Sequence, residues 1–320
     1  MCLRPLAGDA GRGEFLPLQR GAGAVAERPC PAPAAAGPAW GSEPVGPQER
    51  SPMNFLAKIV ARTLEESLRL FQSGKIEEFK AVIPGRLPPV SLKAALDHCP
   101  GTAVIAEVKR ASPSKGEFAM HWDPVELARI YEKNSAAALS VLTERHYFKG
   151  EPDFIVQMRP EIGIPILRKD FILEPVQVYE TAALGADALL LIVSLLELGQ
   201  LRALLLLARS LNLEALVEVH TAAEMEQALA VGANLICINS RDLNTFAMHP
   251  DRALELAPLA PPGVTLVAAS GLKTRADVER LEAAGIRGFL IGETLATAAD
   301  TGAKLREFRG EMKPGRWPQV

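Results

Sequence analysis

The sequence has little cysteine. It contains four cysteines in 320 residues, none in a CxxC pair and none at a spacing that would pair it with histidines. Such a set indicates neither a disulfide framework nor a zinc site. We therefore expect a reduced chain of the cytoplasmic type, without a bound metal.

Excess charge of one sign and long apolar runs are also missing. The 35 Lys and Arg residues nearly balance the 38 Asp and Glu residues, giving a formal net charge of −3. This balance provides no general attraction to nucleic acid or to anionic membranes. The most apolar stretch, residues 188–207, is interrupted by Ser, Glu, Gly, Gln and Arg, too often for a transmembrane helix. We expect neither nucleic-acid nor membrane partners.

Residues 1–52 lack helical or strand periodicity. Glycine and proline occupy 17 of these 52 positions, and five arginines balance five acidic residues. This composition buries too little apolar surface to offset the entropy lost on folding, so we expect a disordered tail or extended start. Plastid import is the weaker alternative, because transit peptides are rich in serine and poor in acids, whereas this segment has two serines. The folded domain is expected at 53–320.

From Met53 onward the apolar residues recur regularly, first with helical spacing over residues 55–71. Eight short apolar runs then alternate with helical segments. The runs centre near Val104, Ala138, Pro165, Leu189, Leu216, Ile236, Leu266 and Phe289. Eight such βα units close a (β/α)8 barrel, whereas an open doubly wound sheet usually has fewer strands and a GxGxxG motif that is absent here. We predict one TIM barrel with an extra N-terminal helix, in the α/β class.

Charged and polar residues follow the predicted strands. Glu107 and Lys109 follow the first strand, and Lys169, Glu218 and Asn239 stand at the ends of three others. The C-terminal ends of the strands form the active site in barrels of this type. Residues i and i+2 of a strand share a face, so lysines and glutamates would converge in a largely dry space that suits acid and base catalysis. Internal salt bridges that merely fill the barrel are the alternative, but they need not gather at one end.

Two loops at the last strands suggest a phosphate site. Ser270–Gly271 closes one strand and Gly292–Glu293–Thr294 closes the next. These loops commonly bind phosphate in this fold through backbone N–H groups, and glycine permits close approach of an anion. Ser112 and Ser114 could add hydroxyl donors after the first strand. Turn glycines and helix caps alone would explain either loop, but the two together favour a phosphorylated ligand.

Other candidate residues carry less information. Phe148, Phe171 and Leu243 follow strand ends, where they could line an apolar pocket or pack in the core. The histidines, including His220, have no partners at ligand spacing, so we expect surface or helix-capping roles. Cys237 lies within a predicted strand, and we expect it to be buried.

These residues resemble a known family. The segment IAEVKRASPSKG at 105–116 closely resembles the signature of the indole-3-glycerol phosphate synthases, and the similarity extends from Met53 to about Phe308. The resemblance implies a carboxy-lyase of tryptophan biosynthesis in the cytoplasm. Its reaction converts the phosphorylated anthranilate–ribulose compound 1-(2-carboxyphenylamino)-1-deoxyribulose 5-phosphate to indole-3-glycerol phosphate, with loss of CO2 and water. It implies no metal or organic cofactor and leaves open an association with other tryptophan-pathway enzymes.

The resemblance also implies site residues. The catalytic set is Glu107, Lys109, Lys169, Glu218, Asn239 and Ser270. Lys169 matches the lysine that protonates the ketone oxygen in ring closure, and Lys109 is its rival for this role. Together with the expected phosphate and ring contacts, the substrate-binding set is Ser112, Ser114, Phe148, Phe171, Arg241, Leu243, Gly271, Gly292, Glu293 and Thr294.

One position departs from the family pattern. The family usually has Val-Ala-Glu-Ser-Gly at the strand that ends near 270, where this chain has Val-Ala-Ala-Ser-Gly. Ala269 removes a carboxylate from the predicted site, so we expect a lower rate or altered lysine pKa values. Two alternatives remain. One is a phosphoribosyl-isomerase barrel, which would not need both lysine–glutamate pairs. The other, which Ala269 supports, is a non-catalytic paralogue that binds a phosphorylated ligand.

Overall fold

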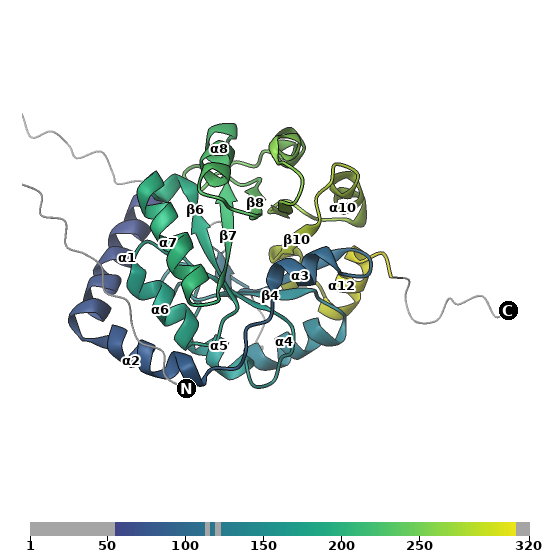
Figure 1. The fold of residues 1–320 in the computed structure, drawn as a ribbon. Helices are drawn as coiled ribbons and strands as arrows, with labels where there is room; N and C mark the ends of the chain where they lie inside the picture. Colours follow the sequence, from purple (N-terminus) through teal and green to yellow (C-terminus); the bar gives the residue numbers. More distant parts are fainter. Residues whose placement is uncertain (1–54, 113–115, 119–122, 312–320) are drawn as a thin grey trace, which may run out of the picture. The chain divides into compact units, whose positions relative to one another are not determined.

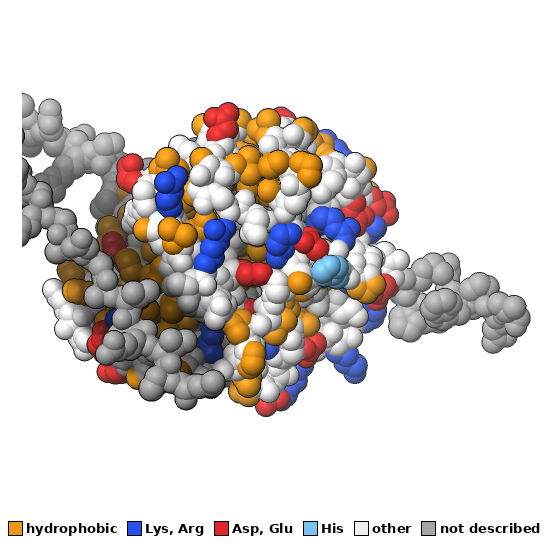
Figure 2. Space-filling view, in the orientation of Figure 1, with side chains coloured by type: hydrophobic (Ala, Val, Ile, Leu, Met, Phe, Trp, Pro, Cys, Tyr) orange, Lys and Arg blue, Asp and Glu red, His pale blue; other side chains and the backbone are white. Residues whose placement is uncertain are grey.

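The computed structural model describes residues 55–112, 116–118 and 123–311 (Figure 1). The predicted tail, residues 1–52, and the predicted phosphate contact Ser114 lie outside these ranges. Within them, no helix is long and apolar enough to cross a membrane. On the face shown in Figure 2, side chains of both charges are interspersed over the surface.

Eight parallel strands close into a barrel, which confirms the predicted (β/α)8 fold. In order around the ring they are β1 (Ala103–Val108), β4 (Ala138–Leu142), β5 (Ile166–Lys169), β6 (Ala188–Ile192), β7 (Glu214–Val219), β8 (Leu235–Asn239), β9 (Thr265–Ala269) and β10 (Gly288–Ile291). β1 pairs with both β4 and β10, so the sheet has no free edge. The run predicted around Pro165 begins as a strand at Ile166, because proline has no N–H to donate to the ladder.

Helices alternate with the strands around the outside (Figure 1). They are α4 (Pro124–Lys133), α5 (Asp153–Met158), α6 (Pro175–Ala183), α7 (Leu198–Ser210), α8 (Ala222–Ala230), α9 (Arg252–Leu256), α10 (Arg275–Glu282), α11 (Glu293–Ala296) and α12 (Thr301–Phe308), with 3-10 turns at Val193–Leu195 and Ala257–Leu259. A short ladder of β2 (Ala111–Ser112) and β3 (Gly116–Glu117) follows β1. Side chains cap several helix starts: Asp123, Thr221 and Thr274 each accept a first-turn N–H, which fixes where α4, α8 and α10 begin.

Strand alternation divides the apolar core into two layers. In β7, Leu216 belongs to the cluster that fills the barrel interior, and its neighbour Val217 belongs to the layer between strands and helices. The next residue, Glu218, therefore points inward again. The same parity turns Glu107, Lys169 and Asn239 toward the interior, at the C-terminal ends of their strands.

The chain before β1 forms three helices: α1 (Phe55–Gln72), α2 (Lys75–Val82) and α3 (Leu92–Asp97), with a 3-10 turn at Ile83–Gly85 after α2. The predicted N-terminal helix is confirmed as α1, whereas α2 and α3 were not predicted. Leu92 and Leu96 of α3 are fully buried in the interior cluster, and Thr265 at the start of β9 donates to Asp97 over 2.7 Å. α3 thus closes the N-terminal end of the barrel.

α1 begins at the opposite end of the barrel. The ring of Phe55 lies 4.8 Å from that of Tyr147 and 5.2 Å from that of Phe246, in the loops after β4 and β8. These three N-terminal helices, residues 55–97, therefore contact both ends of the barrel, and we call them the N-terminal extension.

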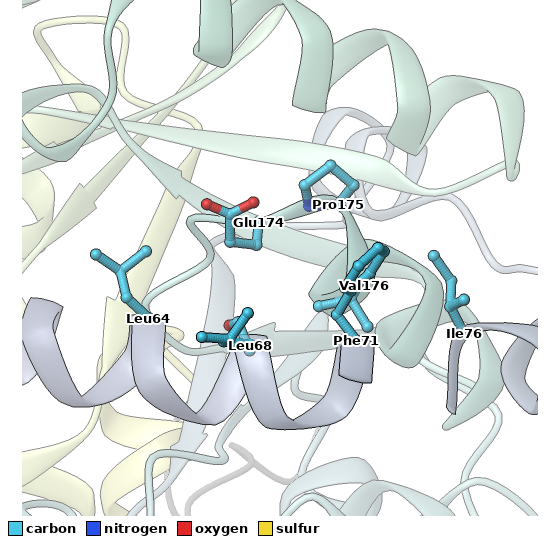
Figure 3. Close-up of a pocket in the computed structure, with 8 residues that line it drawn as sticks. Leu64, Leu68, Phe71, Ile76, Glu174, Pro175 and Val176 are labelled. Carbon is cyan, nitrogen blue, oxygen red and sulfur yellow. The ribbon is translucent and has the colours of Figure 1, made fainter. Parts of the chain in front are cut away.

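The predicted apolar stripe of α1 is buried only over its first half. Leu56 and Ile59 are buried, whereas Phe71 is 62% exposed, because the second half runs along α6 rather than over the barrel. An open groove of about 360 Å³ lies there (Figure 3). Its apolar lining consists of Leu64, Leu68, Phe71, Ile76, Pro175 and Val176.

Candidate active site

The predicted site residues line one pocket at the C-terminal ends of the barrel strands. This holds for every predicted residue within the described ranges, in a pocket of about 340 Å³. Residues that were not predicted also line it, among them Phe246, Met248 and Lys273. The sequence signal for Lys273 was its place two residues after Gly271 in a predicted phosphate loop.

Two lysine–glutamate pairs form the charged part of the pocket. Lys109 Nζ lies 3.4 Å from Glu107 Oε2, and Lys169 Nζ lies 3.8 Å from Glu218 Oε2. Both glutamate side chains are buried, so each needs the opposite charge beside it. β1 extends to Val108, two residues beyond the predicted end at Ala106, so Glu107 lies within the strand. Its backbone is fixed by the barrel ladder.

Asn239 holds the carboxylate of Glu218. Its Nδ2 donates to Glu218 Oε1 over 3.0 Å, while its Oδ1 accepts the backbone N–H of Arg241, also over 3.0 Å. The two bonds use the opposite ends of one amide, which defines its orientation. Arg252 Nη1 donates to the backbone carbonyl of Asn239 over 2.7 Å. The end of β8 is therefore tied to both its own loop and α9.

The two carboxylates determine the charge of Lys169. Burial alone would lower the pKa of this lysine, but the charges of Glu218 and Glu107 outweigh it and raise the pKa above 10.5. Lys169 therefore stays an ammonium at neutral pH. Nearby, burial raises the pKa of the Cys237 thiol well above 9.0, so this buried cysteine stays neutral.

Aromatic side chains form one wall of the pocket. Phe148 and Phe171 lie with ring centres 6.2 Å apart, and Lys109 Nζ lies 5.6 Å from the centre of the Phe148 ring. The loop that carries Phe148 is fixed by the Glu144 carboxylate, which accepts the N–H groups of Tyr147 and Phe148 over 2.7 and 2.9 Å. With Leu243 these rings offer an apolar surface beside an ammonium group.

The glycines of the two loops are required for different physical reasons. Ser270 and Gly271 both adopt the left-handed backbone conformation, with φ of 68° and 79°, which is a strained state for serine. Gly292 was predicted as a close contact for an anion, but a Cβ there would overlap the carboxyl group of Glu107. Its lack of a side chain therefore makes room for a catalytic candidate.

The two predicted phosphate loops are joined to each other. The Thr294 hydroxyl donates to the carbonyl of Leu272 over 2.6 Å, so it links the loop after β10 to the loop after β9. Arg241 Nη2 lies 3.7 Å from Glu293 Oε2. α11 begins at Glu293, directly after β10, and the first N–H groups of a helix have no partner within it. Ser112, at the end of β2, lines the same pocket.

The predicted surface role of His220 is wrong. Its side chain is only 8% exposed and lies between Glu218 and Glu224, at 3.5 Å and 3.4 Å from the nearer carboxylate oxygens. The signal in the sequence was the pair of glutamates two residues before and four residues after the histidine.

Metal ligands do not gather in the described ranges: no group of three or more His, Cys, Asp or Glu side chains there could hold a metal ion. The absence of a cofactor stays a prediction from the resemblance.

A closed (β/α)8 barrel with a polar pocket at the C-terminal ends of its strands is the arrangement of TIM-barrel enzymes. Residues 56–308 match the family model of indole-3-glycerol phosphate synthase. The chain is 46% identical over 261 residues to the indole-3-glycerol phosphate synthase of Carboxydothermus hydrogenoformans, covering 78% of this chain and 98% of that relative. It is 42% identical over 259 residues to that of Leifsonia xyli subsp. xyli, covering 81% and 99%. The chain belongs to the indole-3-glycerol phosphate synthase family.

Solved structures share the fold at much lower sequence identity. The 3-hexulose-6-phosphate synthase from Salmonella typhimurium superposes with a TM-score of 0.54 at 10% identity, covering 65% of this chain and 97% of that one. This similarity shows the barrel architecture and nothing about the reaction.

Proposed function

We propose that this protein is an indole-3-glycerol phosphate synthase. It closes the indole ring of 1-(2-carboxyphenylamino)-1-deoxyribulose 5-phosphate and releases CO2, water and indole-3-glycerol phosphate. The observation that carries this function is the convergence of Lys109–Glu107 and Lys169–Glu218 on one pocket with an apolar wall and glycine loops. The family to which the chain belongs supports the same reaction.

We assign Lys169 as the general acid for ring closure. In this step the ring carbon that bears the carboxylate attacks the ketone carbon, and the ketone oxygen gains negative charge. An ammonium in a largely buried pocket stabilises that oxygen and can donate a proton to it. Lys169 suits this role because the Glu218 and Glu107 charges keep it protonated.

We assign Lys109 as the group that binds the substrate carboxylate. Its ammonium lies over the Phe148 ring, so a benzoate ring stacked near Phe148 and Phe171 would place its carboxylate next to a cation. Loss of CO2 then returns the bonding electrons to the six-membered ring. The last step removes a proton and expels the former ketone oxygen as water, for which Glu218 and Glu107 are the bases and the lysines the acids.

The phosphate group of the substrate is assigned to the loops after β9 and β10. Ser270 and Gly271 offer backbone N–H groups from a left-handed turn, and the start of α11 offers others. Arg241 and Lys273 line the same part of the pocket and supply positive charge. This local charge is needed because the whole chain is slightly acidic.

The direct test is the reaction itself. Purified protein mixed with the carboxyphenylamino substrate should develop the absorbance and fluorescence of an indole. If no indole forms while the substrate still binds, the chain is a binding paralogue and the proposed activity is wrong. A reaction with a phosphoribosyl isomerase substrate instead would support the other alternative.

Ala269→Glu should raise kcat about tenfold, a modest gain beside the factor of about 10² to 10⁴ that a catalytic acid or base contributes. Ala269 is buried at the end of β9 and pairs in register with Asn239, so a glutamate there would add a third carboxylate close to Glu218. Steady-state kinetics of this variant and of Ala269→Gln, which adds the same volume without charge, measure the effect. An unchanged or lower kcat in Ala269→Glu would show that two carboxylates suffice in this chain.

The location and partners of the enzyme are further proposals. We propose that it acts in the cytoplasm and associates with other enzymes of tryptophan synthesis. The free thiols of Cys99 and Cys237 support a reducing compartment. Co-purification of the neighbouring pathway enzymes with the tagged protein, reversed by high salt, would test the association.

A further inference from the structure

His220 connects the proposed base Glu218 to a second carboxylate. The histidine follows β7 directly, two residues after Glu218, so strand alternation turns both side chains to the same side. His220 Nε2 lies 3.5 Å from Glu218 Oε1, and Nδ1 lies 3.4 Å from Glu224 Oε2. The three side chains form a row from the first turn of α8 to the interior of the barrel.

Glu224 is held where it can orient the histidine. Its Oε2 accepts the backbone N–H of His220 over 2.7 Å, and Thr221 caps the helix that carries it. The carboxylate is thus attached to the backbone of the residue whose ring it contacts. Rotation of the His220 ring would separate Nδ1 from this fixed acceptor, so the ring is held with Nε2 toward Glu218.

The two oxygens of Glu218 have different surroundings. Oε1 accepts the Asn239 amide over 3.0 Å and faces His220 Nε2. Oε2 is buried, has no hydrogen-bond partner among the described residues, and lies 3.8 Å from Lys169 Nζ. Oε1 is therefore the anchored oxygen, and Oε2 is the one left to exchange a proton with the substrate.

The charges around His220 favour its protonated form. Burial lowers the pKa of the histidine, as does Arg252 on α9, but the hydrogen bond to Glu224 and the charges of Glu218 and Glu224 outweigh them and raise it above 6.5. Burial would raise the pKa of Glu224, yet the contacts with His220 lower it below 4.5. Among the described residues, Lys169 Nζ lies 3.8 Å from the other oxygen of Glu218, and the neutral thiol of Cys237 is the register partner of Glu218 on β8. A protonated His220 thus adds positive charge next to Glu218.

We propose that His220 is a positioning residue that keeps Glu218 ionised and its Oε2 aimed at the reacting atoms, and that Glu224 holds His220 in place for this task. The proposal rests on the proposed role of Glu218 as a catalytic base. A catalytic base must be ionised for turnover, and an opposite charge within about 4–6 Å favours the ionised form of a carboxyl group. Removing that cation should move the acid limb of the rate profile to higher pH.

The test compares pH profiles of kcat for the wild type, His220→Gln and Glu224→Gln. Glutamine at 220 keeps a hydrogen-bond donor but loses the charge, and glutamine at 224 keeps an acceptor for the His220 N–H. We expect the acid limb to rise by about one pH unit in His220→Gln and by less in Glu224→Gln, since an adjacent opposite charge shifts a carboxyl by about one to three units. KM should change less than twofold.

A matched histidine serves as the control. His98 is exposed at the end of α3, at the other end of the barrel, and His98→Gln should leave the profile unchanged. An acid limb that stays within about 0.3 units of wild type in His220→Gln, with a folded protein by thermal melting, would overturn the proposal. A lower kcat with an unmoved limb would also overturn it, because that pattern is structural.

The role of Glu218 itself is tested separately. Glu218→Gln should lose nearly all turnover whatever residue stands at 220. If Glu218→Gln retains wild-type turnover, the proposed base is wrong, whereas an unmoved limb in His220→Gln together with an inactive Glu218→Gln rejects only the positioning role.

Discussion

Lys169→Ala should lower kcat by about 10³-fold to 10⁴-fold while substrate binding is largely kept. Without the ammonium, the forming oxyanion has neither a proton donor nor a counter-charge at this side of the pocket, and general acid catalysis is worth about 10² to 10⁴. The substitution also removes the cation 3.8 Å from the buried carboxylate of Glu218, and a buried charge without its partner is costly. Single-turnover kinetics and substrate titration separate the two effects.

Lys109→Ala is the matched comparison for Lys169. Lys109 lies over Phe148 and pairs with Glu107, so its loss should raise KM more than it lowers kcat. Lys169→Met, which keeps most of the side-chain volume, checks that packing is not the cause. If the Lys109 variant loses more kcat than the Lys169 variant, Lys109 is the general acid and the two roles exchange.

Gly292→Ala should lower kcat about 100-fold, although it adds a single methyl group. A Cβ at this position would overlap the carboxyl group of Glu107, whose own Cβ lies 3.2 Å away. Glu107 must then rotate away from Lys109, which breaks the 3.4 Å pair that holds that ammonium. Overpacking of this kind also costs about 1–3 kcal/mol of folding free energy. Kinetics and denaturant unfolding measure both consequences.

The control for this substitution is Gly199→Ala. Gly199 lies in α7, and a Cβ there meets nothing within 4 Å. Alanine should therefore stabilise the helix by about 0.5–1 kcal/mol without changing kcat. Wild-type turnover in Gly292→Ala would show that the Glu107 carboxylate can move without harm to the reaction, and that the glycine is not required for the site.

The barrel could be predicted because its signals repeat. Each strand is a short apolar run, and each is followed by a helical segment, so eight units were visible without any single one being decisive. The helices α2 and α3 were missed because they are 8 and 6 residues long and give little periodicity. In α3 only Leu92 and Leu96 are buried, and a pattern of two leucines does not distinguish a helix from a loop.

Much of the candidate site could also be predicted, since alternation along a strand fixes which side chains face inward. Glu107, Lys169 and Glu218 each lie on an inward-facing position near the end of a strand. His220 was missed because its partners come from different elements, one from β7 and the other from α8. The requirement for glycine at 292 could not be predicted either, since the side chain that occupies the space of a Cβ there, Glu107, lies on β1.

The N-terminal extension has a consequence for how the chain folds during synthesis. It leaves the ribosome before any strand of the barrel. Yet Thr265, the partner of Asp97 at the end of α3, follows 168 positions later, and Phe55 of α1 contacts the ring of Phe246. These are contacts of high contact order, which form slowly because a long stretch of chain must be brought together first. We expect the extension to wait undocked, its leucines and isoleucines accessible to chaperones, until β8 and β9 have been made. A segment that is synthesised before every strand of the barrel would then be among the last to reach its native position.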